Sequence, residues 1–575
     1  MPDAPANAAF YFAGQNYRTA GDMMVGRQSA SGGLLKGFIR HGGAETLCGY
    51  VDGPAAAREF HDFAEAAGVP AAKRRTYLPL QMPELGAVGT LFRPGPALGP
   101  PAWARRQFDA RAFSLTGITH TVSDTLALDA LGELLIAPLE PWDALVCTSE
   151  SVKAVVGHVL ADWAAYLEAR FGSRPPLPRL PIIPLGVDAD AVAQRAENPE
   201  TRADLRQRMS IDDEDVALLY AGRLDHVEKA NPIPMLLAAE RAAKATPTKL
   251  HLIQAGQAAT PELATAYKTA ATTLAPSVSH HFVDGAMTEL YEGVWAAADV
   301  FISLSDNIQE SFGLTPIEAM AAGLPCVVSD WDGYRESVID GETGFTVATA
   351  VPPPGAGREL AYYYGSGFAG HAAFAGAASQ STAVDVGAAA EALGKLIADA
   401  DLRARMGAAG RAHAQSVYDW RHVVQAHQAL WAELADVRAT GTSSAAATWP
   451  LRPDPFEAFK AHPTHHIAGA AEIAANPDVG PEAVKALRGA ELAAPVGAML
   501  MDAKAAAALY ARIAEASPVT VATLAAGMDT ADQVPLHLTL GWLAKMGFVT
   551  ISGGGTAKTA FPFAGSSSWK GLAGD

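Results

Sequence analysis

The sequence predicts a multidomain α/β protein, with two doubly wound parallel sheets followed by a small, mainly helical domain. Short apolar runs alternate with helix-like stretches in two successive series, the pattern of strand–helix–strand units. The chain has 575 residues, several times the length of a usual domain, so more than one core is expected. A break in composition at 441–453 separates the third part.

The net charge of the chain indicates which classes of binding partner to expect. The formal net charge is -18, whereas nucleic acids and anionic membranes need a surplus of Lys and Arg on the contact surface. We therefore expect no general nucleic-acid binding, and any anionic ligand must be held by a local site.

The cysteines and the first residues indicate the compartment. Cys48, Cys147 and Cys326 are far apart and form no CxxC pair or Cys/His cluster, which fits a reducing compartment. The first residues lack a signal-peptide pattern, and no apolar run reaches about 18 residues. We expect a cytoplasmic protein that does not span a membrane.

The first series predicts a domain over 1–187. Its apolar runs and helix-like stretches fall at 8–14, 31–43, 112–120, 143–149 and 151–171. Because the runs alternate with amphipathic stretches, they predict a parallel sheet covered by helices.

The second series follows a Pro-rich connector and predicts a domain over 188–415. Its apolar runs fall at 216–222, 249–256, 279–285, 299–305 and 325–330. Residues 351–382 are rich in Gly, Ala and aromatics without clear periodicity, and we interpret them as an inserted loop. Residues 416–440 have a helical pattern and are expected to return to the first domain.

Residues 454–575, after the linker at 441–453, predict a separate domain. Its order of helix, short helix, helix and hairpin resembles a winged helix in shape. DNA readers of that shape carry basic residues on the third helix, but here Lys545 stands almost alone among apolar residues, which are Leu538, Leu540, Trp542 and Leu543. An apolar contact with the rest of the chain, a second copy in a homo-oligomer or another protein is therefore favoured over DNA binding.

The stretch 299–347 carries the most informative pattern. A buried strand is followed by a loop that delivers Glu310, and Thr315 and Pro316 suit the N-cap and first position of a helix. Glu318 falls at the capping-box position, so a purely structural role is one interpretation. The other is a ligand site: a Gly-containing loop at a helix N-terminus suits a diphosphate, and carboxylates accept hydrogen bonds from hydroxyls. Phosphate and polyol together indicate a nucleotide sugar.

These residues resemble glycosyltransferase family 4, the retaining enzymes of the GT-B fold. The resemblance rests on Glu310 and Glu318 with seven residues between them, on EAMAAGLPCVVSD and on GETGFTV. It extends less sharply to PIIPLGVD, LLYAGRLDHVEK, TELYEGVWAAADVF and LRARMGAAGRAHAQSVYDW. It implies two Rossmann-like domains facing a cleft, an acceptor-side domain at 1–187 and a nucleotide-sugar domain at 188–415.

The resemblance also implies roles on the donor loop. Glu310 would contact hydroxyls of the transferred sugar, and Glu318 would hold the ribose of the nucleotide. The residues that would bring backbone groups to the donor sugar and phosphate are Phe312, Gly313, Leu314 and Thr315.

Arg223 and Lys229 would neutralise the diphosphate as it leaves, although they stand one residue further apart than is usual in the family. An exposed pair of solvated charges is the alternative.

His120, at the end of a strand, stands where relatives place a histidine near the sugar; a satisfied polar residue is the other interpretation. Gly26 is the candidate for a first-domain loop that approaches the phosphate. Its competitors are Gly14, Gly21, Gly32 and Gly33.

Two acidic patterns resemble the metal-binding DxD motif. Asp188 to Asp190 follows a connector as a helix cap, and Asp330 to Asp332 follows a strand as a turn. We expect neither to bind a metal, and no cofactor besides the donor substrate.

The leading hypothesis is a retaining glycosyltransferase whose acceptor could be a glycan, a lipid, a protein or a small molecule. The alternatives are a GT-B epimerase or phosphorylase, and a non-catalytic assembly or regulatory protein acting through the C-terminal domain. Peripheral membrane contact through the basic stretches 71–78 and 101–111 is a further hypothesis, against solvated basic surfaces.

Overall fold

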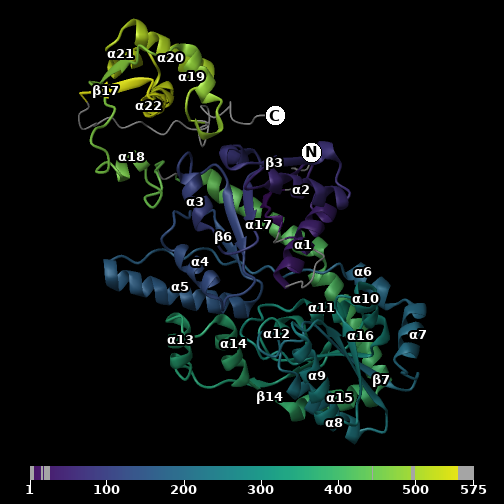
Figure 1. The fold of residues 1–575 in the computed structure, drawn as a ribbon. Coiled ribbons are helices and arrows are strands. Elements are labelled where there is room, and N and C mark those ends of the chain that lie inside the picture. The colour runs from purple at the N-terminus through teal and green to yellow at the C-terminus, as the bar shows by residue number, and fades with distance from the viewer. Residues whose placement is uncertain (1–5, 15–16, 18–25, 443–444, 494–498, 554–575) are drawn as a thin grey trace. The chain divides into compact units, whose positions relative to one another are not determined.

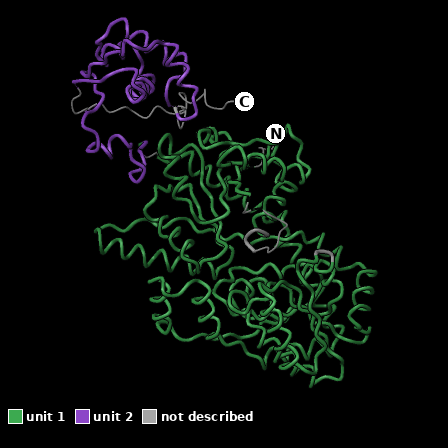
Figure 2. Tube along the Cα trace, viewed as in Figure 1, with its two compact units in different colours: residues 1–445 green, residues 446–575 purple. Residues whose placement is uncertain are grey.

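The computed structural model describes the chain except for residues 1–5, 15–16, 18–25, 443–444, 494–498 and 554–575. The chain divides into two compact units, residues 1–445 and 446–575 (Figure 2). The division falls inside the linker expected at 441–453. Among the described residues, no helix combines the length and apolar character needed to cross a bilayer.

The first half of unit 1 is built on a six-stranded parallel sheet in the order β3-β2-β1-β4-β5-β6. Its strands are β1 (Ala9–Tyr11), β2 (Leu47–Tyr50), β3 (Arg74–Tyr77), β4 (Thr90–Arg93), β5 (Ser114–Ile118) and β6 (Ala144–Val146). Its helices are α1 (Gly26–His41), α2 (Pro54–Ala66), α3 (Gly99–Arg106), α4 (Thr125–Glu133) and α5 (Glu150–Phe171). Apart from β3 and the end of β4 the strands are almost wholly buried, as expected when helices cover both faces.

The second half repeats this topology, with the order β12-β11-β10-β7-β8-β9. Its strands are β7 (Val216–Ala221), β8 (Leu250–Gly256), β9 (Ser279–Asp284), β10 (Val300–Ser303), β11 (Cys326–Ser329) and β12 (Gly344–Val347). Its helices are α6 (Ala189–Ala196), α7 (Pro199–Arg208), α8 (Pro232–Ala245), α9 (Pro261–Leu274), α10 (Thr288–Ala297), α11 (Leu314–Ala321), α12 (Tyr334–Ser337), α15 (Val386–Ala398) and α16 (Ala400–His413). Both sheets have the Rossmann strand order, which confirms the predicted pair of doubly wound domains.

The long helix α17 (Trp420–Thr440) returns to the first half, and Figure 1 shows it beside α1. The indole of Trp431 donates to Thr116 of β5 at 3.2 Å, and Trp420 packs against two glycines of α1, Gly33 and Gly37. A single buried apolar cluster runs from Phe10 through these tryptophans to the second sheet. The two sheets therefore share one continuous core.

The segment 351–382, interpreted from sequence as an inserted loop, is instead partly helical. It contains α13 (Arg358–Gly365) and α14 (His371–Gln380), flanked by the antiparallel strands β13 (Thr349–Ala350) and β14 (Ala383–Val384). Helix α13 has only eight residues, about two turns, and none is buried, so it is too short for a helical period to be recognised in the sequence. The Gly and Ala residues of α14 pack closely but add little hydrophobic periodicity.

The stretches considered for membrane contact use several of their basic residues inside the fold. Arg105 is fully buried and forms a two-pronged ion pair with Asp143, at 2.6 and 2.7 Å. Arg74, in the edge strand β3, pairs with Glu65 at 2.9 Å, and only 9% of its side chain is exposed. These arginines are internal anchors, so they are unavailable to a bilayer.

Unit 2 has its own apolar core and a three-stranded antiparallel sheet in the order β16-β15-β17. Its elements are α18 (Pro455–Ala458), β15 (Glu472–Ala475), α19 (Pro481–Arg488), α20 (Ala503–Glu515), β16 (Val519–Thr520), α21 (Val521–Ala525), α22 (Thr530–Lys545) and β17 (Val549–Ser552). The second strand of the expected hairpin lies outside the described residues. Leu540, Trp542 and Leu543 of α22 lie in the core of the unit, so the apolar partner contact expected for them is wrong.

Candidate donor-sugar site

The predicted donor loop connects β10 to α11, and its first residues are buried. Leu304, Ser305, Asp306 and Asn307 are at most 2% exposed, and the backbone N–H of Glu310 donates to the carbonyl of Asn307 at 3.2 Å. The expected helix start is wrong by two residues: the N-cap is Gly313, not Thr315, and Leu314 is the first helical residue. Thr315 and Glu318 therefore form no capping box, and Glu318 is free for another role.

Gly313 needs to be a glycine for two reasons. Its φ of +85° lies in the left-handed region, and a Cβ there would meet Cε1 of Tyr334 at 2.0 Å. The buried Tyr334 ring thus fixes where the chain passes from the loop into α11, and with it the amides that follow Phe312.

Glu310 and Lys229 form an ion pair at the centre of this site. Their side chains are 11% and 20% exposed, and they come from different segments of the second half. Burial is the largest single effect and lowers the pKa of Lys229, but the Glu310 carboxylate, Tyr334 and Tyr220 together outweigh it, and the net pKa is raised. The lysine therefore stays charged and neutralises Glu310.

Arg223 follows β7 on the same connection as Lys229. Its guanidinium lies 3.5 Å from Asp225 and 3.8 Å from Glu228, and a quarter of the side chain is exposed. The Asp225 carboxylate also accepts the backbone N–H groups of Val227 and Glu228, at 2.9 and 3.0 Å. This connection is a tight turn that carries two cations and two carboxylates.

Glu318 lies in the second turn of α11. Burial raises the pKa of its carboxyl, and the charges of Arg195 and Lys229 oppose this shift. The neighbouring Tyr291, on α10, also has a raised pKa, because it is buried and lies near Glu318. Lys229 thus acts on both glutamates of the predicted motif.

The first half meets the donor loop through the ends of β5 and β6. The Ser311 hydroxyl donates to the backbone carbonyl of His120, and the Ser149 hydroxyl lies 3.1 Å from the carbonyl of Ser311. The His120 ring lies 3.4 Å from the hydroxyl of Ser31 on α1. The structure therefore places His120 next to the donor loop.

Asp332, read from sequence as part of a turn, also faces this site. Its φ is +47°, a conformation that few non-glycine residues adopt, and its Oδ1 accepts from Ser149 at 3.3 Å. Burial and then the nearby Glu310 charge raise the pKa of Asp332 to about 8, while Ser149 lowers it. The raised pKa favours the protonated form of the Asp332 carboxyl near neutral pH.

The remaining acidic positions of the two DxD-like patterns have partners of their own. Asp188 caps α6 and pairs with Arg40 at 2.6 Å, and Asp190 pairs with Arg421 at the same distance. Asp330 pairs with Arg335 at 3.1 Å. Across the part of the chain that the structure describes, no three His, Cys, Asp or Glu side chains gather as a metal site.

Gly26 is the first residue of α1 rather than a loop residue. Its competitor Gly21 lies outside the described residues, Gly14 follows β1, and Gly32 and Gly33 are inside α1. Ser31, one turn beyond Gly26, reaches His120, so the first turns of α1 point towards this part of the first half.

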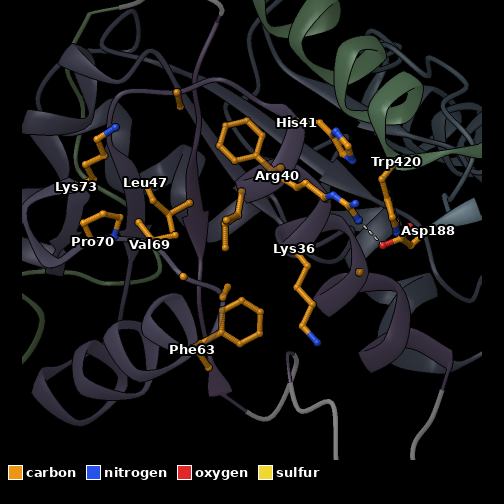
Figure 3. Close-up of a pocket in the computed structure, with 18 of the residues that line it drawn as sticks. Lys36, Arg40, His41, Leu47, Phe63, Val69, Pro70, Lys73, Asp188 and Trp420 are labelled. Atoms are coloured by element: carbon orange, nitrogen blue, oxygen red, sulfur yellow. Dashed lines mark hydrogen bonds and ion pairs between the residues drawn. The ribbon is translucent and has the colours of Figure 1, made fainter. Parts of the chain in front are cut away.

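A cavity of about 960 Å³ lies beside α1, separate from the donor loop (Figure 3). Lys36, Lys73 and Phe63 line it from the first half, and the Arg40–Asp188 ion pair forms part of its wall. None of the residues that the sequence assigns to the donor lines this cavity, whereas Gly33, a competitor of Gly26, and Asp188, of a DxD-like pattern, do.

Sequence reasoning missed Ser149, Tyr334 and His371, which touch the site through tertiary contacts. Ser149 is also the N-cap of α5, since its hydroxyl accepts from the backbone N–H of Val152 at 3.1 Å. His371 stands in the segment without periodicity, so no pattern singled it out. Asp332 had one signal: an aspartate in a turn before Gly333 suits a positive φ.

Two parallel doubly wound halves, joined by a helix that returns to the first, define the class of the fold as GT-B. Residues 201–352 match the family described as glycosyl transferases group 1, and they contain Arg223, Lys229, Glu310 and Glu318. The similarity to that family covers residues 201–352, within the second half of unit 1.

Two relatives and one solved structure illustrate the similarity. The chain is 31% identical over 243 residues to D-inositol 3-phosphate glycosyltransferase of Geodermatophilus obscurus, covering 41% of this chain and 51% of the relative. It is 28% identical over 264 residues to the GDP-mannose-dependent alpha-(1-6)-phosphatidylinositol monomannoside mannosyltransferase of Mycolicibacterium smegmatis, covering 44% and 57%. The Anabaena protein HepE in complex with UDP aligns with a TM-score of 0.49 at 16% identity, over 74% of this chain and 100% of HepE. The chain thus spans about half the length of the curated relatives.

Proposed function

We propose that the chain is a retaining, family 4 glycosyltransferase that moves a sugar from a nucleotide-diphosphate donor to an acceptor. The observation that carries this proposal is the Lys229–Glu310 ion pair, set beside Glu318 on the loop and first turns of α11. A cation and two carboxylates set together in this way support binding of a diphosphate, a sugar and a ribose. The names of the relatives, which include nucleotide-sugar-dependent enzymes, support the same donor class.

The proposed chemistry breaks the bond between the sugar anomeric carbon and the diphosphate oxygen. The acceptor oxygen attacks from the face on which the diphosphate leaves, and its proton passes to the leaving phosphate. Arg223, Lys229 and the N-terminus of α11 stabilise the charge that develops there. Glu310 holds sugar hydroxyls, the backbone from Phe312 to Thr315 follows the donor, and His120 and Gly26 approach from the first half.

Binding of a donor would require the ion pair between Lys229 and Glu310 to separate. In the free protein Lys229 neutralises Glu310. A bound donor offers the lysine a diphosphate and offers the carboxylate sugar hydroxyls, so both partners gain new contacts as the pair separates.

A panel of nucleotide sugars, scored by hydrolysis and thermal stabilisation, tests the proposed activity. We expect one donor to stabilise the protein and to be slowly hydrolysed, and Glu310→Gln to lower turnover at least about 100-fold without changing the fold. Glu168→Gln removes an exposed, ion-paired carboxylate of α5 and is the matched control. Donor binding without turnover would favour a non-catalytic role, and interconversion of donor sugars would favour an epimerase.

We also propose that catalysis needs no metal, because Arg223, Lys229 and the helix end supply the positive charge. Activity is then expected to be the same with and without EDTA. Loss of turnover that Mg²⁺ or Mn²⁺ restores would contradict this and return attention to the DxD-like patterns.

For residues 454–575 we propose a winged-helix-like accessory domain that recognises the acceptor or a second copy of the chain. The order α20, α21, α22 and β17 supports this shape. Because the apolar side chains of α22 are used in its own core, the contact surface must lie elsewhere on the domain.

A further inference from the structure

The helical insertion packs against the turn that carries the two cations. Gly376 of α14 is so close to Val227 that a Cβ would meet the valine Cγ1 at 2.9 Å. Ala375, Gly376 and Ser379 are buried on this side of the helix. The carbonyl of Val227 also accepts from the Asn307 amide at 2.5 Å, so the turn is fixed between the insertion and the donor loop.

His371, the first residue of α14, uses both ring nitrogens on this surface. Its Nε2 lies 3.0 Å from the hydroxyl of Ser123, three residues beyond His120 in the first half. Its Nδ1 lies 3.3 Å from Oε1 of Glu228, and the other oxygen of Glu228 lies 3.8 Å from Arg223. An unbroken chain of polar contacts therefore runs from the first half, through the insertion, to the guanidinium proposed to bind the diphosphate. Figure 1 shows α14 on the side of the second half that faces α4 and α5.

The contacts with His371 and Arg223 restrict the orientation of Glu228, and Glu228 in turn restricts Arg223. Glu228 has one carboxylate oxygen towards Arg223 and the other towards His371, so each of its two oxygens has a partner on this surface. A neutral imidazole donates from Nδ1 to Glu228 and accepts from Ser123, while a protonated ring donates to both, so the bridge forms in either state. Only 22% of the His371 side chain is exposed, which limits competition from water.

We propose that His371 is a positioning residue for the donor diphosphate: it sets the place of Arg223 through Glu228 and ties that place to the first half through Ser123. This rests on the proposed function, because it assigns Arg223 to the diphosphate. It gives the insertion at 351–382 a role in donor binding.

Substitutions of His371 separate its two contacts. Asparagine places an amide nitrogen near the position of Nδ1 and keeps the contact with Glu228; glutamine reaches the position of Nε2 and keeps the contact with Ser123. We expect His371→Ala to weaken binding of UDP or GDP, whichever the protein binds, about tenfold, as for loss of a charge-assisted hydrogen bond. His371→Asn should recover most of this loss, and His371→Gln should not. His158→Ala, on the exposed face of α5, is the control and should bind as the wild type does.

Amide hydrogen exchange on the free protein gives a second, ligand-independent result. Exchange over residues 223–230 should be faster in His371→Ala than in the wild type, and close to wild type in His371→Asn. Wild-type affinity in His371→Ala, or equal losses in the alanine, asparagine and glutamine variants, would overturn the proposal. If the wild type binds neither UDP nor GDP, the donor assignment fails, and the exchange result alone decides whether His371 positions the turn.

Discussion

At the scale of single residues, the site depends on how charge is distributed among three carboxyl groups. Glu310 is neutralised by Lys229, Glu318 has a raised pKa through burial, and Asp332 has a pKa of about 8. A carboxylate paired with a lysine accepts hydrogen bonds from hydroxyls, whereas a carboxyl whose raised pKa favours the protonated form can also donate one. The site can thus recognise both donor and acceptor atoms of a polyol.

The raised pKa of Asp332 makes stability depend on pH. The ordinary value is 3.8, so between about pH 4 and pH 8 the folded protein holds a proton on Asp332 that the unfolded chain releases. Each rise of one pH unit in this window lowers the free energy of unfolding, by up to about 1.4 kcal/mol. An asparagine at position 332 has no titrating proton, and its side-chain oxygen still accepts the hydrogen bond from the Ser149 hydroxyl.

We therefore expect Asp332→Asn to gain stability relative to the wild type by at least about 1 kcal/mol between pH 5 and pH 7. Urea unfolding at pH 5, 6 and 7 measures this difference. Asp162→Asn, which removes an exposed carboxylate of α5, controls for the change in net charge. A constant difference between Asp332→Asn and the wild type across this range would show that Asp332 is ionised in the folded protein.

At the scale of elements, the short helix α11 depends on the passage of the chain through Gly313. Alanine there would have to adopt a positive φ and displace the buried Tyr334 ring. We expect Gly313→Ala to cost about 2–4 kcal/mol of stability and to weaken donor binding, because the loop amides shift with the helix start.

Gly341→Ala is the matched control for that substitution. Gly341 has a similar φ of +75°, but nothing lies within 4 Å of the position of a Cβ. It should cost only about 1 kcal/mol and leave donor binding unchanged. Equal costs at the two positions, measured by urea unfolding, would mean that Tyr334 yields and does not fix the loop.

Some helices and strands are well predicted from the sequence and others are not, for physical reasons. Strands such as β10 and β11 are buried on both faces, so each is a continuous apolar run that the sequence reveals. The edge strand β3 is Arg-Arg-Thr-Tyr and has no such run. Helix α13 has only eight residues, so its apolar positions span too few turns for a helical period to be recognised.

The sequence predicts the part of the candidate site whose residues lie in one local stretch. It does not predict the part whose residues come together only in the folded chain. Glu310 and Glu318 stand in a recognisable stretch, and the structure places Lys229 beside Glu310. Asp332 and His371 gain their surroundings from segments far away in sequence, 183 residues for the contact of Asp332 with Ser149 and 248 for that of His371 with Ser123. Such proximity has no local signal.

At the scale of the whole molecule, unit 1 holds every described residue proposed to bind the donor. Its buried clusters join both sheets through α17, while the core of unit 2 contains residues of that unit alone. Each unit thus has the separate hydrophobic core that independent folding requires.

A chain ending at residue 445 should therefore fold and bind the donor with a dissociation constant within about twofold of that of the full chain. Transfer to the natural acceptor, or the oligomeric mass, should change, because the proposed role of unit 2 is recognition and not donor binding. Calorimetric titration with the donor and light scattering measure the two effects on the same preparations. A truncated chain that is monodisperse and shows the thermal unfolding of a folded protein, yet binds no donor that the full chain binds, would assign unit 2 to the donor site and contradict the division of roles at residue 445.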